Sequence, residues 1–344
     1  MSTYPPHPSY TRVGVQINIM LGTSKLTIWI MTGLFAITTV FFNLYIFLMS
    51  LFKYKQTKQW SPSETIIAAL SVANVVHQLI CYFWMTLDEI DRNCNIVEMP
   101  YSIILLLIFS LKFTIVWDTS FLTFYYSIKL VNTTNQCFTQ IQAVIIKHVT
   151  VVVCLIPLCA LGTCVPMLVV FVPENQTENN QDCGMMTPDS YTGRIYEAML
   201  LLFSDVLPGV FMVKCCVSIS VHLAIHLRNM KASTNGAHGP KMGSQLRVIQ
   251  MALSLVGTFL CFLVVDLYVN YQIVVHHENA VVLAFLFISI FTTGTPVVLI
   301  YGKKSLWKAL LHEYNIFLDV YPCLSCLKVS EEKDKPSTPA KLKN

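Results

Sequence analysis

Five ionisable side chains lie within stretches that are apolar enough to cross a bilayer: Lys112, Asp118, Asp205, Lys214 and Asp266. Charges at such depth are costly, and they usually face the interior of a helix bundle or a water-filled cavity. Three roles are open to them. They can line a cavity for a polar ligand, lock helices together as ion pairs, or form a proton or ion pathway.

The depths of these charges can be estimated from the rise of an α-helix, about 1.5 Å per residue. Lys112, Asp205 and Asp266 share an outer tier at roughly 12–16 Å below the outer surface. Asp118 and Lys214 form a second tier at about 26 Å. We predict that Lys112 neutralises Asp205 or Asp266, and that Asp118 faces Lys214.

One geometric objection concerns the fifth apolar stretch. Asp205 and Lys214 are nine residues apart, which is about 180° around an ideal helix. Both can point inward only if Pro208 rotates the lower half of the helix. Ion pairs that only join helices therefore remain an alternative to a ligand cavity.

Enzymatic and nucleic-acid functions find no support in the sequence. It has no H-E-x-x-H, no G-x-S-x-G and no phosphate loop. His276, His277 and Glu278 are adjacent, but they lie in a short outer loop and indicate a solvated turn more than a metal site. We expect no catalytic residue, no metal, no cofactor and no nucleic-acid partner.

The composition indicates an integral membrane protein. Charged residues make up 12% of the 344 residues, about half the usual ~25% of soluble domains. Seven apolar stretches reach the roughly 20 residues that span a bilayer. They cover about 26–51, 63–86, 101–129, 146–172, 195–227, 247–274 and 280–301. The predicted fold is an all-α bundle of seven transmembrane helices.

The distribution of charge predicts the orientation. Most of the 23 Lys and Arg residues fall on one side if the N-terminus lies outside, as cytoplasmic loops require. We therefore expect residues 1–25 to be a short extracellular N-terminus and 26–301 to be the transmembrane domain. Residues 302–316 are expected to form an amphipathic cytoplasmic helix, followed by a disordered cytoplasmic tail at 317–344.

Several loop residues are candidates for modification. Cys94 and Cys183 lie in outer loops, where disulfides persist, so they form either a bridge or two unpaired thiols. Asn175 lies in an outer N-x-T sequence and is the expected glycosylation site. Cys323 and Cys326 follow the amphipathic stretch and are expected to be palmitoylated.

Several ordered motifs resemble the bitter taste receptor family, taste receptor type 2. They are "FFNLYIFLMS", "WSPSETIIAALSVAN", "VWDTSFLTFYYSIKLVN", "HLRNMK", "SQLRVIQMALSL" and "GTPVVLIYGKKSLWKAL". The chain departs from the usual family pattern at Asn74, Gln245, Thr295 and Lys303. The resemblance thus indicates a divergent member, from a lineage that need not be mammalian, and the vomeronasal type 1 family is the nearest rival.

The resemblance implies a G-protein-coupled receptor with an agonist site in the outer half of the bundle. Lys112 falls where many members have an agonist-contacting asparagine, and Ile108 where many have a tryptophan that stacks on the ligand. A cation at Lys112 should favour acidic or electron-rich ligands, unless an aspartate already saturates it. The candidate ligand-binding residues are Lys112, Ile108, Phe109, Asp205, Asp266 and Tyr82.

The family also implies a heterotrimeric G protein as the cytoplasmic partner, besides small bitter agonists and membrane lipid. Candidate G-protein contacts are Lys129, His226, Arg228 and Arg247; each can instead be a basic residue that anchors a helix end. The expected location is the plasma membrane of chemosensory cells. A transporter or channel is the alternative from a different class, and the odd number of spans and the absence of repeats argue against it.

Overall fold

The computed structural model describes residues 9–91, 98–130, 136–170, 172–173, 186–187, 190–233, 243–271 and 281–320. Within this part of the chain, seven helical segments are long and apolar enough to cross a membrane. They are Leu26–Thr57, Pro62–Ile90, Pro100–Leu130, Val149–Val170, Tyr191–Ile225, Leu246–Tyr271 and Val282–Gly302. The predicted bundle of seven transmembrane helices is confirmed; which side each end faces stays a prediction.

Three spans are single helices at the start of the chain, namely α1 (Ser9–Thr57), α2 (Pro62–Ile90) and α3 (Glu98–Leu130). The short α4 (Gln136–Lys147) precedes the fourth span, which consists of α5 (Val149–Cys164) and α6 (Met167–Val170). The fifth span consists of α7 (Tyr191–Leu201), the π-helical turn η1 (Leu202–Val206) and α8 (Leu207–Ser233). The remaining helices are α9 (Gly243–Tyr271), α10 (Val281–Gly302) and α11 (Lys304–Val320).

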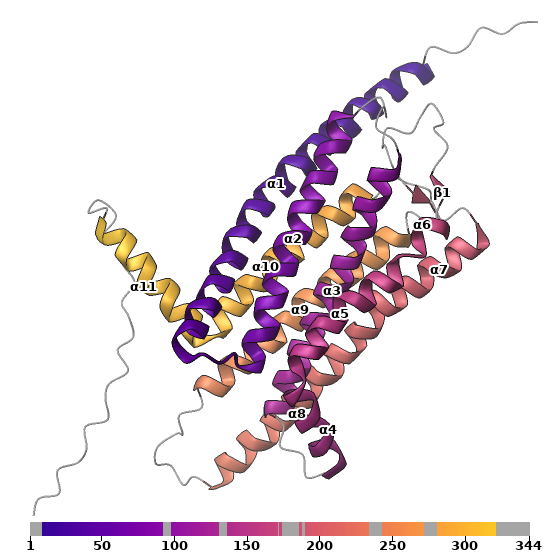
Figure 1. Cartoon of the computed structure of the whole chain (residues 1–344). Coiled ribbons are helices and arrows are strands. Elements are labelled where there is room, and N and C mark those ends of the chain that lie inside the picture. Colours follow the sequence, from indigo (N-terminus) through magenta and orange to yellow (C-terminus); the bar gives the residue numbers. More distant parts are fainter. Residues whose placement is uncertain are drawn as a thin grey trace, which may run out of the picture.

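Two differences from the predicted boundaries concern the ends of the bundle. Helix α1 begins at Ser9, well before the predicted start of the first span near residue 26. Helix α11 covers Lys304–Val320, where we predicted an amphipathic helix over 302–316. It leaves the end of α10 and extends away from the bundle (Figure 1). The predicted tail at 317–344 lies outside the described residues from 321 onward.

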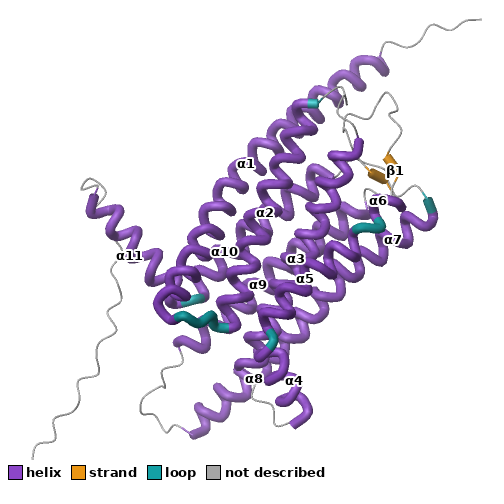
Figure 2. The backbone as a smooth tube through the Cα atoms, viewed as in Figure 1, coloured by secondary structure: helices purple, strands orange, loops and turns teal. Residues whose placement is uncertain are grey.

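Helix α3 lies in the middle of the bundle (Figure 1). It contacts α2, α5, α8 and α9, while α10 closes the arrangement by packing against both α1 and α9. A two-residue strand pair is the exception to the helical architecture (Figure 2). It joins β1 (Val172–Pro173) to β2 (Met186–Thr187) in antiparallel register.

Polar side chains join α1, α2 and α10 inside the bundle. Asn74 donates to Oδ1 of Asn43 at 3.2 Å. Gln78 donates to Ser289 at 2.9 Å and accepts from Thr292 at 3.1 Å. Hydrogen bonds of this kind hold helices together where lipid offers no partner, and they fix the relative rotation of these three spans.

The π-helical turn in the fifth span follows from Pro208. The N–H of Leu207 bonds to the carbonyl of Leu202, five residues earlier, and Pro208 has no N–H to give. Neither residue can therefore satisfy the carbonyl of Phe203. The indole N–H of Trp117 on α3 does so instead, at 3.0 Å. The turn thus places one residue more between α7 and α8 than an α-helix would hold, and it joins this span to α3.

Candidate functional site

Lys112 on α3 makes two ion pairs in the outer tier of charges. Its Nζ lies 2.8 Å from Oδ2 of Asp266 on α9 and 3.2 Å from Oδ2 of Asp205 in η1. Asp205 is fully buried, and the other two are more than nine-tenths buried. We predicted one aspartate as the partner of Lys112, and the structure gives it both.

The neighbouring side chains orient this ion cluster. Asn270 donates to Oδ2 of Asp266 at 3.3 Å and to its backbone carbonyl at 2.7 Å. The hydroxyl of Ser204 donates to Oδ2 of Asp205. The Lys112 ammonium lies 5.5 Å from the ring centroid of Phe262, within cation–π range. The cluster therefore has a defined geometry that joins three spans.

A cavity lies against this cluster, between α3, α7, η1 and α9. Its lining residues are Phe109, Lys112, Glu197, Leu200, Leu201, Ser204, Asp205 and Asn270. The cavity has a volume of about 40 Å³ and opens to solvent at its mouth. Apolar walls with a few convergent polar groups are typical of small-molecule sites.

Two carboxylate oxygens at the cavity have no hydrogen-bond partner within the described part of the chain. They are Oδ1 of Asp205 and Oε2 of Glu197, and both are buried. A buried carboxylate oxygen without a donor is costly. These atoms are therefore free to accept hydrogen bonds from a molecule in the cavity.

The predicted ligand-binding residues divide into two groups. Phe109, Lys112 and Asp205 line the cavity, and Asp266 reaches it through its contact with Lys112. Ile108 is instead buried in an apolar cluster at this end of the bundle. Tyr82 stacks on Trp29 of α1, with ring centroids 5.8 Å apart. Neither Ile108 nor Tyr82 is among the residues that line the cavity.

The prediction that Asp118 faces Lys214 is wrong. Asp118 is 1% exposed, and its Oδ1 has no hydrogen-bond partner among the described residues. Lys214 is exposed on the outside of α8. The physical reason is the one raised by the spacing: with Asp205 pointing inward, a residue nine positions later points outward.

Glu197 and Asn270 line the cavity but were missed by sequence reasoning. Both lie near the predicted outer ends of their spans, where polar residues are common and carry little signal. Their rotational positions next to Phe109 and Asp205 could not be read from sequence. An estimate of depth for every polar residue, and not only for the central charges, would have placed them between the outer tier and the predicted outer surface.

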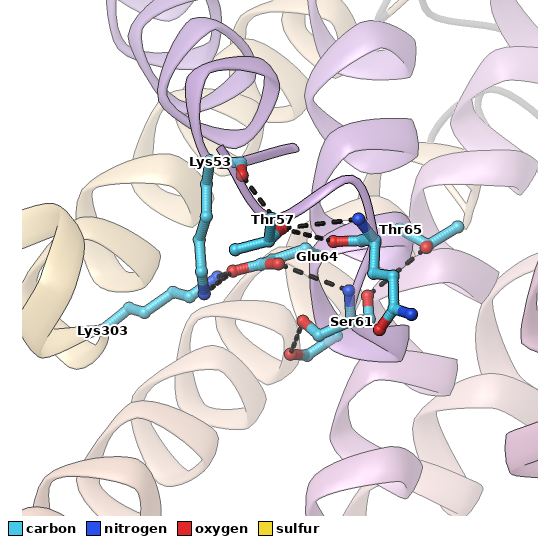
Figure 3. Close-up of polar contacts among 8 residues, drawn as sticks. Lys53, Thr57, Ser61, Glu64, Thr65 and Lys303 are labelled. Atoms are coloured by element: carbon cyan, nitrogen blue, oxygen red, sulfur yellow. Dashed lines mark hydrogen bonds and ion pairs between the residues drawn. The ribbon is translucent and has the colours of Figure 1, made fainter. Parts of the chain in front are cut away.

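At the opposite end of the bundle, three charged residues join α1, α2 and the junction of α10 with α11 (Figure 3). Lys53 donates to Oε1 of Glu64, and the same oxygen lies 3.3 Å from Nζ of Lys303. Oε2 of Glu64 accepts from the backbone N–H of Ser61 at 3.4 Å, as in a capping box. Burial lowers the pKa of the Lys303 ammonium, and the charge of Glu64 opposes that shift. We call Lys53, Glu64 and Lys303 the Glu64 cluster.

The predicted G-protein contacts lie at this same end. Lys129 and Arg228 are exposed at the ends of α3 and α8, and Arg247 is half-buried near the start of α9. His226 lies on α8. The predicted modification sites Cys94, Asn175, Cys183, Cys323 and Cys326 all lie outside the described residues.

In the described part of the chain, no three His, Cys, Asp or Glu side chains are grouped closely enough to hold a metal ion.

Comparison with protein families identifies a relationship: the family model described as taste receptor protein (TAS2R) matches residues 20–314. A search of curated proteins gave no match.

Proposed function

Because the chain belongs to the TAS2R taste receptor family, we propose that it binds small bitter compounds in the outer half of its bundle and activates a heterotrimeric G protein. An agonist can shift a receptor toward its active state only by binding that state more tightly. The plasma membrane of chemosensory cells is the proposed location, with the N-terminus outside.

The observation that carries this proposal is the cavity beside the Lys112 ion cluster. Its lining comes from α3, α7, η1 and α9, and these elements belong to the third, fifth and sixth spans. A ligand there would contact three spans at once. Any change in their relative positions would change its affinity, and this coupling is what a receptor needs.

The opposite end of the bundle supports the second half of the proposal. Lys129, Arg228 and Arg247 lie on α3, α8 and α9, the helices that form the same three spans, at the end opposite to the cavity. Two of these side chains are exposed and the third is half-buried. Each is thus available to the acidic or polar surface of a partner, and His226 is proposed with them on the strength of the family resemblance.

The test is a calcium measurement in cells that express the chain with a promiscuous G protein, challenged with a broad panel of bitter compounds. We expect a concentration-dependent signal that disappears when the G protein is omitted. Arg228→Ala and Lys129→Ala should lower the maximal signal at equal surface level. Lys55→Ala, an exposed lysine at the same end on α1, is the matched control and should leave the signal unchanged.

Two results would contradict the proposal. One is silence across the panel despite good surface expression. The other is a ligand-evoked ion current that persists without a G protein, which would favour a transporter or channel.

A further inference from the structure

We propose that the cavity beside the Lys112 ion cluster selects organic cations, with the ammonium group of the ligand seated between Asp205 and Glu197. This inference rests on the proposed function, because it names the ligand class of the same cavity. It reverses the preference for acidic ligands that Lys112 alone would give.

The first step is the charge balance of the site. The ammonium of Lys112 is already held by Asp205 and Asp266. Glu197 adds a third carboxylate to the lining. Three carboxyl groups against one ammonium give the site more acidic than basic groups, so it favours cations over anions.

The second step is the position of the free acceptors. Oδ1 of Asp205 and Oε2 of Glu197 are buried and have no hydrogen-bond donor in the described part of the chain. The opposite oxygen of Asp205 accepts from both Lys112 and Ser204. These two unpaired oxygens remain for a ligand, and both are acceptors for an N–H or O–H donor or for a cation.

The third step concerns the other charge near Glu197. Arg194 lies one turn earlier on α7 and attracts the Glu197 carboxylate. Its side chain is exposed and is not among the residues that line the cavity. Arg194 thus acts on Glu197 through solvent, which screens the interaction. It does not fill the place of a ligand cation inside the cavity.

The apolar part of the lining suits an alkylated ammonium group. Phe109, Leu200 and Leu201 lie beside the carboxylates, and aromatic rings attract quaternary ammonium ions. The site therefore combines negative charge, free acceptors and an apolar wall.

The experiment compares three probes of nearly one shape. Choline is a cation, 3,3-dimethylbutan-1-ol is its neutral carbon isostere, and 3,3-dimethylbutanoate is an anion of similar size. The purified full chain in a maltoside detergent without choline lipids is titrated with each, and thermal unfolding gives the apparent Kd. Addition of phosphatidylcholine in a separate arm shows whether a lipid headgroup competes for the same place.

We expect choline to bind at least about tenfold more tightly than the neutral isostere, and the anion to bind most weakly. Glu197→Gln should weaken choline by about 10- to 100-fold and leave the neutral probe unchanged. Glu197→Lys should make the anion the best of the three probes. Glu89→Gln makes the same change near the end of α2, outside the cavity lining. It should leave the affinities for all three probes unchanged.

Equal binding of choline and its isostere would overturn the cation site. The absence of choline binding up to about 100 mM would also overturn it, since a Kd of that size corresponds to a binding free energy of only about −1.4 kcal/mol. Signalling separates this failure from that of the proposed function. A calcium signal evoked only by neutral or anionic compounds keeps the receptor and removes the cation site. Tight choline binding without any G-protein activation keeps the cation site and contradicts the proposed receptor function.

Discussion

At the scale of single residues, Lys112 forms ion pairs with two carboxylates that come from different helices. Asp205 belongs to η1 and Asp266 to α9, and both point at one ammonium. Removal of one member of a buried ion pair leaves an uncompensated charge, which costs more than the pair contributes. The lysine is therefore a structural element as well as part of the cavity lining.

Lys112→Met keeps the length of the side chain and removes its charge. We expect it to destabilise the receptor by about 3–5 kcal/mol, because two buried carboxylates lose their shared cation. Thermal unfolding of the purified chain measures the loss. Lys214→Met, at an exposed lysine of α8, should leave stability within about 0.5 kcal/mol. If Lys112→Met costs as little stability as Lys214→Met, the ion cluster does not stabilise the fold. If Lys112→Met is destabilising, Asp205→Asn and Asp266→Asn together should restore most of the lost stability.

Asp118 presents the opposite situation, since it is buried, with an unpaired oxygen and no ion pair within the part of the chain that the structure describes. Asp118→Asn removes the cost of a buried charge while keeping the size of the side chain. We expect a higher unfolding temperature and a higher surface level. A lower unfolding temperature would mean that Asp118 has a partner that binds its charged form.

At the scale of secondary-structure elements, two glycines test how closely α9 and α10 pack. A methyl group on Gly302 would overlap the side chain of Met251 on α9. A methyl group on Gly257, an exposed position within α9, meets nothing within 4 Å.

Gly302→Ala should therefore destabilise the bundle by about 1–3 kcal/mol through overpacking. Gly257→Ala should stabilise it by about 0.5–1 kcal/mol, because alanine loses less backbone freedom in a helix. Thermal unfolding of the two variants beside the parent chain makes the comparison. Equal effects would show that propensity, and not packing, decides both positions.

The sequence predicts the depth of a residue along its helix better than the direction in which its side chain points around the helix. Depth follows from residue counts, because the rise per residue of a helix is nearly constant, and it brought Lys112, Asp205 and Asp266 to one level. Rotation does not follow, because errors accumulate along a helix and a π-turn adds to them. Asp118 and Lys214 were paired by depth alone, although the nine residues between Asp205 and Lys214 already argued against that pairing. The Glu64 cluster was not foreseen either, since Glu64 and Lys303 are 239 residues apart.

At the scale of the whole molecule, the surface that surrounds the bundle is largely apolar. Leu158, near the middle of the fourth span, is 65% exposed, and only 22% of the most apolar part of this span is buried. A surface of this kind is stable against lipid and not against water.

Leu158→Asp should therefore lower the amount of chain that reaches the cell surface, since a charge at the centre of a span costs about 2.5–3.5 kcal/mol on insertion. Leu158→Phe should be tolerated. Surface labelling, normalised to total expression, gives the comparison. Equal surface levels for the two variants would place this face of α5 against protein or water.

The Glu64 cluster acts on the whole bundle because it joins the first two spans to the end of the last. Lys303→Met should cost about 1–2 kcal/mol through loss of a charge-assisted hydrogen bond to Glu64. Lys55→Met, at an exposed lysine of α1 at the same end of the bundle, should cost less than about 0.5 kcal/mol. Thermal unfolding distinguishes them, and an equal cost would assign the effect to net charge.

The π-helical turn at Leu202–Val206 gives the fifth span one residue more than a regular helix of the same length. A regular α-helix would cover the same distance with one residue fewer, so the span holds one residue in reserve. Each residue that such a turn passes along a helix rotates by about 100° and advances by about 1.5 Å. The turn holds Asp205 against Lys112, while the Phe203 carbonyl that it leaves open is held by Trp117. Translation of the turn by one step would swing that carboxylate out of the cavity without lengthening or shortening the helix.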